Sequence, residues 1–375
     1  MAESNEIKPL TGLRGVAALY VVAFHYLDGL TFSSPGKTFL AHGYLAVDLF
    51  FVLSGFVMAL SYARMFYTGF SLSTYWKFLG RRLARVYPLY LAATVVALFL
   101  VLLGWLPYIG PGSLGITFIA NLFMIQTWGI GASLDAPGWS ISTEWAAYLL
   151  FPLLLIPALY RRALYAWLSG AVALAILGVL CWIPASVAHK ASADAVLNLS
   201  EPRLALPVWR CLSEFLLGLL AFRIASDTRG LFRASRGWIS SFLVLAALAA
   251  LTVPRADLFF VFLLPPLIAV LSEGEYLPQR ILSSEIAQLG GKLSYSIYLV
   301  HVLFTDALGF IHHQVALLGL PHGQSYGAVV CIVLTLVCAW LAHRFIEVPA
   351  RQWLRRVLEP RKAGRTTREP VLETK

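Results

Sequence analysis

Two ionisable side chains share one face of the first apolar segment. Arg14 and His25 stand eleven residues apart in the sequence LRGVAALYVVAFHY, residues 13–26. A helix turns by about 100° per residue, so eleven steps leave a remainder of about 20° and both side chains project from the same face. A rise of about 1.5 Å per residue separates them by about 16 Å along the helix. Because ionisable residues inside a membrane span are unfavourable, they mark a functional site by default.

The chemistry that this pair suggests is proton transfer. Desolvation disfavours the charged imidazole, so His25 in a dry site stays neutral. A neutral imidazole is the form that takes a proton from a hydroxyl group. The alternatives are an Arg14 that snorkels to lipid phosphates and a His25 that is a hydrogen-bonded core residue. The shared face favours the functional interpretation.

A carboxylate stands early in the second apolar segment. Asp48 lies in YLAVDLFFVLSGF, and a charge at such a place requires a partner. Gly55 follows seven residues later on nearly the same face, where it would allow close approach of another helix. A structural ion pair that fixes helix packing and a catalytic role for Asp48 remain equally open.

Three arginines gather where the third apolar segment begins. The sequence RRLARVYPLY contains Arg81, Arg82 and Arg85, and the first and last of these are i, i+4 neighbours on a helix. A pair of guanidinium groups suits a phosphate or diphosphate. On spacing alone, the excess of basic residues in cytoplasmic loops is the favoured explanation.

Polar residues also stand at the start of a fourth apolar segment, in the sequence PGWSISTEW, residues 137–145. Ser140 or Ser142 can cap a helix there, and Glu144 in the first turn suits the helix dipole. Capping accounts for the serines. It accounts less well for Glu144, which is followed at once by an apolar span.

A polar stripe runs through LSYSIYLVH, residues 293–301. Ser294, Tyr298 and His301 fall at i, i+4 and i+7 of an otherwise apolar helix. Such a stripe lines a cavity or forms interhelical hydrogen bonds. In RFIEVPAR, residues 344–351, we expect a helix stop and a charge anchor.

The elements that must position these residues are membrane spans. The chain is 59% hydrophobic and 13% charged, with a mean hydropathy of +0.75. Soluble domains have about 45–50% apolar and about 25% charged residues, so a soluble fold is excluded. We expect an all-α integral membrane protein, a polytopic bundle of about ten transmembrane helices. The expected spans are residues 13–30, 43–63, 86–105, 143–160, 163–183, 208–225, 237–253, 257–272, 292–311 and 325–346.

The apolar segment 114–128 is too short for a crossing, which needs about 20 residues. The loop at 64–85 and the turn at Arg161 and Arg162 are both basic, so both are expected on the cytoplasmic side. An even number of crossings must separate them. We therefore expect a short re-entrant or interfacial helix at 114–128 and both termini in the cytoplasm.

The net charge of +10 is concentrated near the C-terminus. We interpret residues 351–375 as a basic cytoplasmic tail that contacts the anionic lipid bilayer, not nucleic acid. The four cysteines lie in or beside apolar runs and are expected to be core residues, with no disulfide and no metal site. The N-terminus lacks the pattern of a cleavable signal peptide.

Six segments together resemble the acyltransferase-3 family of membrane acyltransferases, over residues from about 7 to 351. In chain order they are the Arg14 and His25 pair, VDLFFVLSGF, RRLARVYPLY, GWSISTEW, SYSIYLVH and FIEVP. The resemblance implies that residues 1–350 form an acyltransferase-3-like transmembrane domain. It implies O-acylation, most often O-acetylation, of a carbohydrate hydroxyl with acyl-CoA as the donor. We expect a bacterial inner-membrane protein that modifies an exopolysaccharide or another surface glycan, with polysaccharide-biosynthesis proteins as candidate partners.

The resemblance also implies site residues. His25 is expected to be the base, with Arg14 beside it and Glu144, Asp48, Ser294 and Tyr298 as further catalytic candidates. Arg81, Arg82 and Arg85 are expected to hold the phosphates of acetyl-CoA, which is a donor substrate and not a permanently bound cofactor. Trp139, Tyr295 and His301 are expected to bind substrate. About 28 residues follow the last span, so no fused esterase-like domain is expected.

The expected mechanism is direct transfer, in which His25 removes a proton from the acceptor hydroxyl as it attacks the thioester. Arg14 or a residue of the 294–301 stripe would stabilise the oxyanion. A covalent acyl-enzyme on Ser294 or Tyr298 ranks below direct transfer. A transporter or flippase of acyl groups or lipid-linked sugars is the alternative function, since buried charges alone fit it equally well. A purely structural membrane subunit is disfavoured by the many polar residues in the spans.

Overall fold

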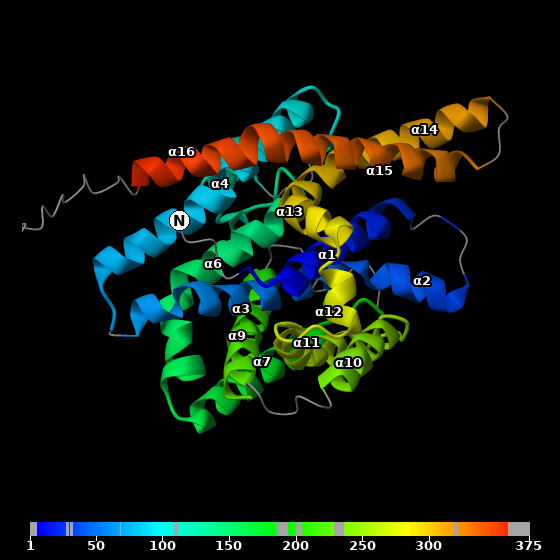
Figure 1. The fold of residues 1–375 in the computed structure, drawn as a ribbon. Coiled ribbons are helices and arrows are strands. Elements are labelled where there is room, and N and C mark those ends of the chain that lie inside the picture. Colours follow the sequence, from blue (N-terminus) through cyan, green and yellow to red (C-terminus); the bar gives the residue numbers. More distant parts are fainter. Residues whose placement is uncertain are drawn as a thin grey trace, which may run out of the picture.

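The computed structural model describes residues 6–27, 30, 33–67, 69–108, 112–184, 186, 194–199, 205–228, 236–318 and 322–358. Every regular element in these ranges is a helix, and the ranges contain no strand (Figure 1). The expectation of an all-α fold is therefore confirmed for this part of the chain. The predicted tail beyond residue 358 lies outside the described residues.

The first half of the chain forms helices that run from α1 to α7. They are α1 (Lys8–Leu27), α2 (Ser34–Ala41), η1 (His42–Leu45), α3 (Ala46–Phe66), α4 (Leu72–Leu102), α5 (Leu114–Leu122), η2 (Gln126–Ile130), α6 (Gly138–Leu155), η3 (Ile156–Tyr160) and α7 (Ala163–Trp182). The second half continues with α9 (Leu206–Asp227), α10 (Arg236–Ala250), α11 (Asp257–Leu271), α12 (Leu277–Leu282), α13 (Glu285–Val300), η5 (His301–Phe304), α14 (Thr305–Leu317), α15 (Gly323–Ala342), η6 (His343–Glu347) and α16 (Val348–Leu358).

Seven helical segments are long and apolar enough to cross a membrane. They are Lys8–Leu27, Ser34–Phe66, Leu72–Leu102, Gly138–Tyr160, Ala163–Trp182, Glu285–Leu317 and Gly323–Leu358. The other three predicted spans are helices too, but α10 and α11 have only 15 residues each and α9 carries four charged residues. The multi-span helical fold is thus confirmed, and a total of ten crossings stays a prediction.

The segment predicted to be too short for a crossing is a nine-residue helix, α5. Two residues after the end of α5, the backbone departs from helical geometry at Met124, whose φ is +56°. A left-handed backbone at a non-glycine residue breaks a helix. The chain then turns through η2 toward the start of α6.

Helices α1 and α13 pack so closely that only glycine fits between them. A Cβ atom on Gly15 would clash with the backbone of Gly290 and Gly291, and one on Gly291 would clash with the carbonyl oxygen of Thr11. Small residues at a helix crossing allow such close packing in membranes. This contact holds α1 against α13 near the centre of the bundle (Figure 1).

A second close crossing joins α3 to α9. A Cβ atom on Gly55 would clash with the Phe215 carbonyl, and one on Gly218 would clash with the Val52 carbonyl. The predicted close approach of a helix at Gly55 is confirmed, and its partner is α9. At the C-terminal end of the described chain, α16 packs along α4 (Figure 1).

Candidate active site

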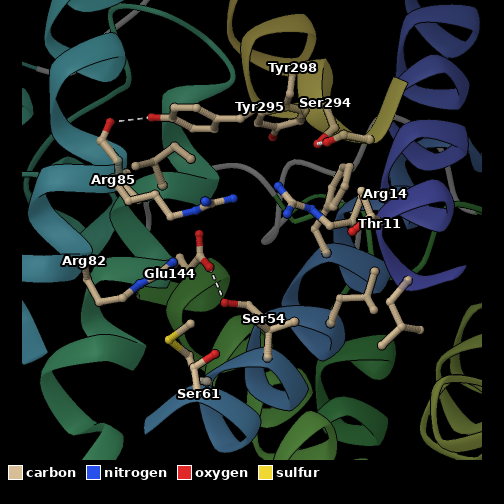
Figure 2. A pocket seen from close by; sticks show the side chains of 18 of the residues that line it. Thr11, Arg14, Ser54, Ser61, Arg82, Arg85, Glu144, Ser294, Tyr295 and Tyr298 are labelled. Carbon is tan, nitrogen blue, oxygen red and sulfur yellow. Dashed lines mark hydrogen bonds between the residues drawn. The ribbon is translucent and has the colours of Figure 1, made fainter. Parts of the chain in front are cut away.

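A cavity of about 690 Å³ lies between α1, α3, α4, α6, α13 and the η6–α16 segment. The labelled side chains of Figure 2 show its polar lining: Thr11, Arg14, Ser54, Ser61, Arg82, Arg85, Glu144, Ser294, Tyr295 and Tyr298. Five motifs that are widely separated in the sequence therefore meet around one space.

Two guanidinium groups point toward each other across this cavity. Arg14 comes from α1 and Arg85 from α4, and the carboxylate of Glu144 lies close to the gap between them (Figure 2). Glu144 accepts hydrogen bonds from the hydroxyl groups of Ser54 and Tyr148. These bonds hold the carboxylate in one place beside the arginines.

Arg82 fixes the same network from α4. Its Nη2 donates to the Tyr148 hydroxyl at 2.6 Å, and its guanidinium carbon lies 4.6 Å from the centroid of the Tyr148 ring. Within the described structure the Nε of Arg82 is buried and has no hydrogen-bond partner. Arg82 is thus an inner, buried member of the arginine group.

The cavity carries an excess of positive charge. Its described lining contains seven basic and three acidic side chains, a formal excess of four positive charges with His343 neutral. The basic ones are Arg14, Arg81, Arg82, Arg85, Lys292, Arg351 and Arg355, and the acidic ones are Glu6, Glu144 and Glu347. A concave site of one sign of charge attracts ligands of the opposite sign. Phosphate groups suit such an arginine-rich lining.

The predicted polar stripe of α13 is divided by the structure. Ser294 and Tyr298 line the cavity, and the Tyr295 hydroxyl donates to the Val86 carbonyl at 2.6 Å, which ties α13 to α4. His301 does not line this cavity. It follows the last residue of α13 and begins the 3₁₀ turn η5.

His25 lies outside the cavity, although Arg14 on the same helix lines it. The His25 side chain is exposed, and its Nδ1 donates to the Val21 carbonyl at 3.0 Å. Its ring centroid lies 4.8 Å from that of His301. The two residues predicted to act together are therefore in different places. Arg14 lines the cavity, and His25 packs against the ring of His301.

Asp48 also lies away from the cavity, in a buried ion cluster. Arg210 on α9 contacts both Asp48 oxygens, with its Nε 3.1 Å from Oδ1, and the same Nε lies 3.5 Å from Oε1 of Glu214. All three side chains are 0% exposed. The Arg210 guanidinium carbon lies 5.5 Å from the ring of Trp139. For Asp48 this geometry favours the packing role over the catalytic one.

Glu347 is a cavity residue whose place the sequence did not reveal. The expected charge anchor is 3% exposed, and it accepts from Ser296 Oγ and His343 Nδ1, both at 2.9 Å. Arg351 approaches it at 3.9 Å. A carboxylate between an apolar helix and a basic segment could have been recognised as functional by its unfavourable position alone.

Metal ligation receives no support from the described residues, in which no group of three or more His, Cys, Asp or Glu side chains could hold an ion. Among the cysteines, Cys211 and Cys331 are buried.

Asp135 is a second residue that the sequence did not indicate. It precedes α6, is 2% exposed, and its carboxyl oxygens have no hydrogen-bond partner in the described structure. Burial raises the pKa of Asp135 to about 8. The folded state therefore binds a proton that the unfolded state has released, and the free energy of unfolding decreases as the pH rises from about 4 to about 8.

The Asp135→Asn variant is expected to unfold at a higher temperature than the wild type at pH 9, by an amount corresponding to about 1 kcal/mol or more. Near pH 5 the difference should shrink, because the wild-type carboxyl is then protonated. Thermal unfolding in nanodiscs at both pH values measures this effect, with Asp194→Asn at an exposed carboxylate as the control. Equal pH dependence in Asp135→Asn and wild type would contradict the assignment.

Comparison with known proteins identifies the family to which the sequence is related. The sequence model of a family described as an acyltransferase domain matches residues 7–344. The Acyltransferase MdmB of Streptomyces mycarofaciens is 31% identical, with 92% of each chain covered. The O-acetyltransferase OatA of Staphylococcus aureus is 25% identical over 92% of this chain, which spans only 57% of the length of OatA. No solved structure matches the chain.

Proposed function

This chain belongs to the acyltransferase-3 family of membrane acyltransferases, and on that basis we propose that it transfers an acyl group, most often acetyl, from acyl-CoA to a carbohydrate hydroxyl. The observation that carries the donor assignment is the cavity with its formal excess of four positive charges. Coenzyme A is a long molecule with several phosphate groups. A deep basic cavity fits such a ligand, whereas a shallow neutral site would not.

The donor phosphates bind at the basic rim of the cavity. Arg81 and Arg85 on α4, which line the cavity, provide two guanidinium groups. Arg351 and Arg355 on α16 face the same cavity at i, i+4 spacing, and Lys292 adds a fifth positive charge. Arg82 is buried against Tyr148, so it supports the inner end of the donor site.

The pantetheine arm extends through the inner end of the cavity, which Arg14, Glu144 and Tyr298 line, and the thioester lies beyond Tyr298, near His25. Arg14 or the Tyr298 hydroxyl stabilises the negative charge that develops on the carbonyl oxygen. His25 takes the proton from the acceptor hydroxyl. The rings of Tyr298, His301 and His25 follow one another from the cavity wall outward, so the pantetheine arm must extend along them for the thioester to reach the base.

The cavity rim faces the cytoplasm in this proposal, and both chain termini lie on that side. Ten crossings satisfy this orientation. The acceptor is a bacterial exopolysaccharide or another surface glycan, and the enzyme acts in the inner membrane. The name of the relative OatA, an O-acetyltransferase, supports acetyl as the acyl group.

Replacing Arg351 and Arg355 together with alanine is expected to raise the KM for acyl-CoA by about 100-fold or more, because each of the two charge-assisted hydrogen bonds contributes about 1.5–3 kcal/mol. At saturating donor, kcat should change by less than about threefold, since the two residues lie far from the reacting atoms. Donor titrations in nanodiscs measure both quantities. Arg356→Ala on the same helix is the matched control, because Arg356 is exposed and does not line the cavity. An unchanged KM in the double variant would remove α16 from the donor site.

A further inference from the structure

Glu347 stands at the junction between the last long apolar helix and the basic helix α16. The π-helical turn η6 separates α15 from α16, and Glu347 is its last residue. Such turns are rare and are frequently found at functional sites. Glu347 lines the donor cavity and is 3% exposed. A buried carboxylate in a membrane protein calls for a functional explanation.

The two oxygens of this carboxylate contact different groups. Oε2 accepts hydrogen bonds from Ser296 Oγ on α13 and from His343 Nδ1, both at 2.9 Å. Oε1 lies 3.9 Å from Nη1 of Arg351 on α16. That distance is too long for a hydrogen bond but short enough for an ion pair. Glu347 therefore joins α16 to α13 and orients the Arg351 guanidinium without occupying one of its N–H groups.

Helix α16 has little else to fix the end that follows Glu347. Within its described length no side chain is buried, although Arg351 and Arg355 line the cavity. At its other end α16 approaches α4, where a Cβ atom on Gly80 would lie 3.4 Å from Leu358 Cδ1. The buried carboxylate thus provides an anchor at the start of α16, and the contact with α4 provides one at its end.

The spacing along the chain gives this anchor a direct effect on the arginines. Glu347, Arg351 and Arg355 follow one another at intervals of four residues, and side chains four apart are neighbours on one face of a helix. The two guanidinium groups repel each other. Because the carboxylate stands at the inner end of this row, it attracts Arg351 toward the cavity.

A carboxylate among arginines can affect phosphate binding in two opposite ways. Its charge repels a phosphate directly, and it also interacts electrostatically with Arg14 and Arg85. Alternatively, it strengthens binding because it orients Arg351. The geometry favours the second effect, since the carboxylate is fixed by two hydrogen bonds and the cavity keeps a formal excess of four positive charges with Glu347 included.

We propose that Glu347 is the positioning residue of the donor site, which holds Arg351 in the orientation that binds a phosphate group of coenzyme A. This inference rests on the proposed function. Glu347 acts through Arg351 and contacts neither the donor nor the reacting atoms.

Glu347→Gln is the sharpest test. The glutamine amide oxygen can still accept from Ser296 and His343, but the charge that faces Arg351 is removed. We expect the Kd for coenzyme A and the KM for acetyl-CoA to rise by about fivefold. The kcat at saturating donor should stay within about threefold of the wild type. In an Arg351→Ala background the same substitution should change the Kd by less than about twofold, because no guanidinium remains to be oriented.

The matched control is Glu285→Gln, because Glu285 on α13 is exposed and does not line the cavity. If the glutamine variant does not fold, Glu347→Asp serves as the second variant. It keeps the charge but withdraws it by one methylene group, so its Kd should rise less than that of the glutamine variant and, again, only when Arg351 is present.

A lower Kd in Glu347→Gln would overturn the proposal, because the carboxylate would then act as a repelling charge. An unchanged Kd, or an equal increase with and without Arg351, would also overturn it, since Glu347 would then act independently of that arginine. A wild type that binds coenzyme A but transfers no acyl group would remove the proposed function and leave the Kd values to decide the role of Glu347. A wild type that does not bind coenzyme A would overturn both.

Discussion

Acyl transfer to the acceptor is expected to fall by at least about 10²- to 10⁴-fold when His25 is replaced by alanine, the range that general-base catalysis contributes. The alanine removes the group that takes the proton from the attacking hydroxyl. Donor binding should stay intact, because His25 lies outside the cavity that holds the arginines. The variant thus separates the chemical step from donor affinity.

The measurement is the initial rate of labelled acyl transfer in nanodiscs, together with the Kd for coenzyme A. His313→Ala controls for the loss of an imidazole elsewhere. Retention of the wild-type rate in His25→Ala would end its assignment as the base. A loss of coenzyme A binding in that variant would mean that the helix as a whole has moved.

Removal of the Arg210 side chain is expected to destabilise the protein by about 3–5 kcal/mol. Arg210→Met leaves the carboxylate of Asp48 without its counter-charge beside the carboxyl group of Glu214, and both side chains are 0% exposed. Breaking a buried pair by deleting one partner leaves an uncompensated charge, which is why the effect is large. It should also loosen the contact of α3 with α9 at Gly55.

Thermal unfolding with fluorescence detection measures this loss. The matched control is Arg255→Met, because Arg255 and its partner Asp194 are 65% and 64% exposed and such a surface pair contributes only about 0–1 kcal/mol. The triple variant Arg210→Met, Asp48→Asn and Glu214→Gln should recover part of the stability, since it removes the unpaired charges. Equal unfolding temperatures for Arg210→Met and the wild type would exclude a stabilising role for the cluster.

Local sequence patterns were sufficient to predict the helices and the close approach of a partner at Gly55. They could not identify that partner. Asp48 requires a counter-charge, but Arg210 lies 162 positions further along the chain, and only tertiary packing unites the two. The position of Glu347 on the cavity wall also depends on tertiary packing, so the local sequence could not predict it.

The candidate site was predictable in kind but not in shape. Helical geometry gives the shared face of Arg14 and His25 and their axial separation, but not where the cavity ends between them. The polar stripe of α13 was predicted as one surface, yet Ser294 and His301 lie in different environments because the helix tightens at η5. Arg351 and Arg355 were interpreted as part of a tail, because a basic helix end gives the same sequence signal whether it contacts lipid or a ligand.

The most direct test of the central claim is acyl transfer by the purified wild-type protein in nanodiscs, with acetyl-CoA labelled in the acetyl group and a panel of carbohydrates. Release of free coenzyme A thiol is followed in the same reaction. We predict that label appears on a carbohydrate hydroxyl in equal amount to the thiol released. If acetyl-CoA is neither bound nor consumed with any acceptor, the donor assignment of the cavity is wrong, and transport of acyl groups or lipid-linked sugars becomes the better account of its buried charges.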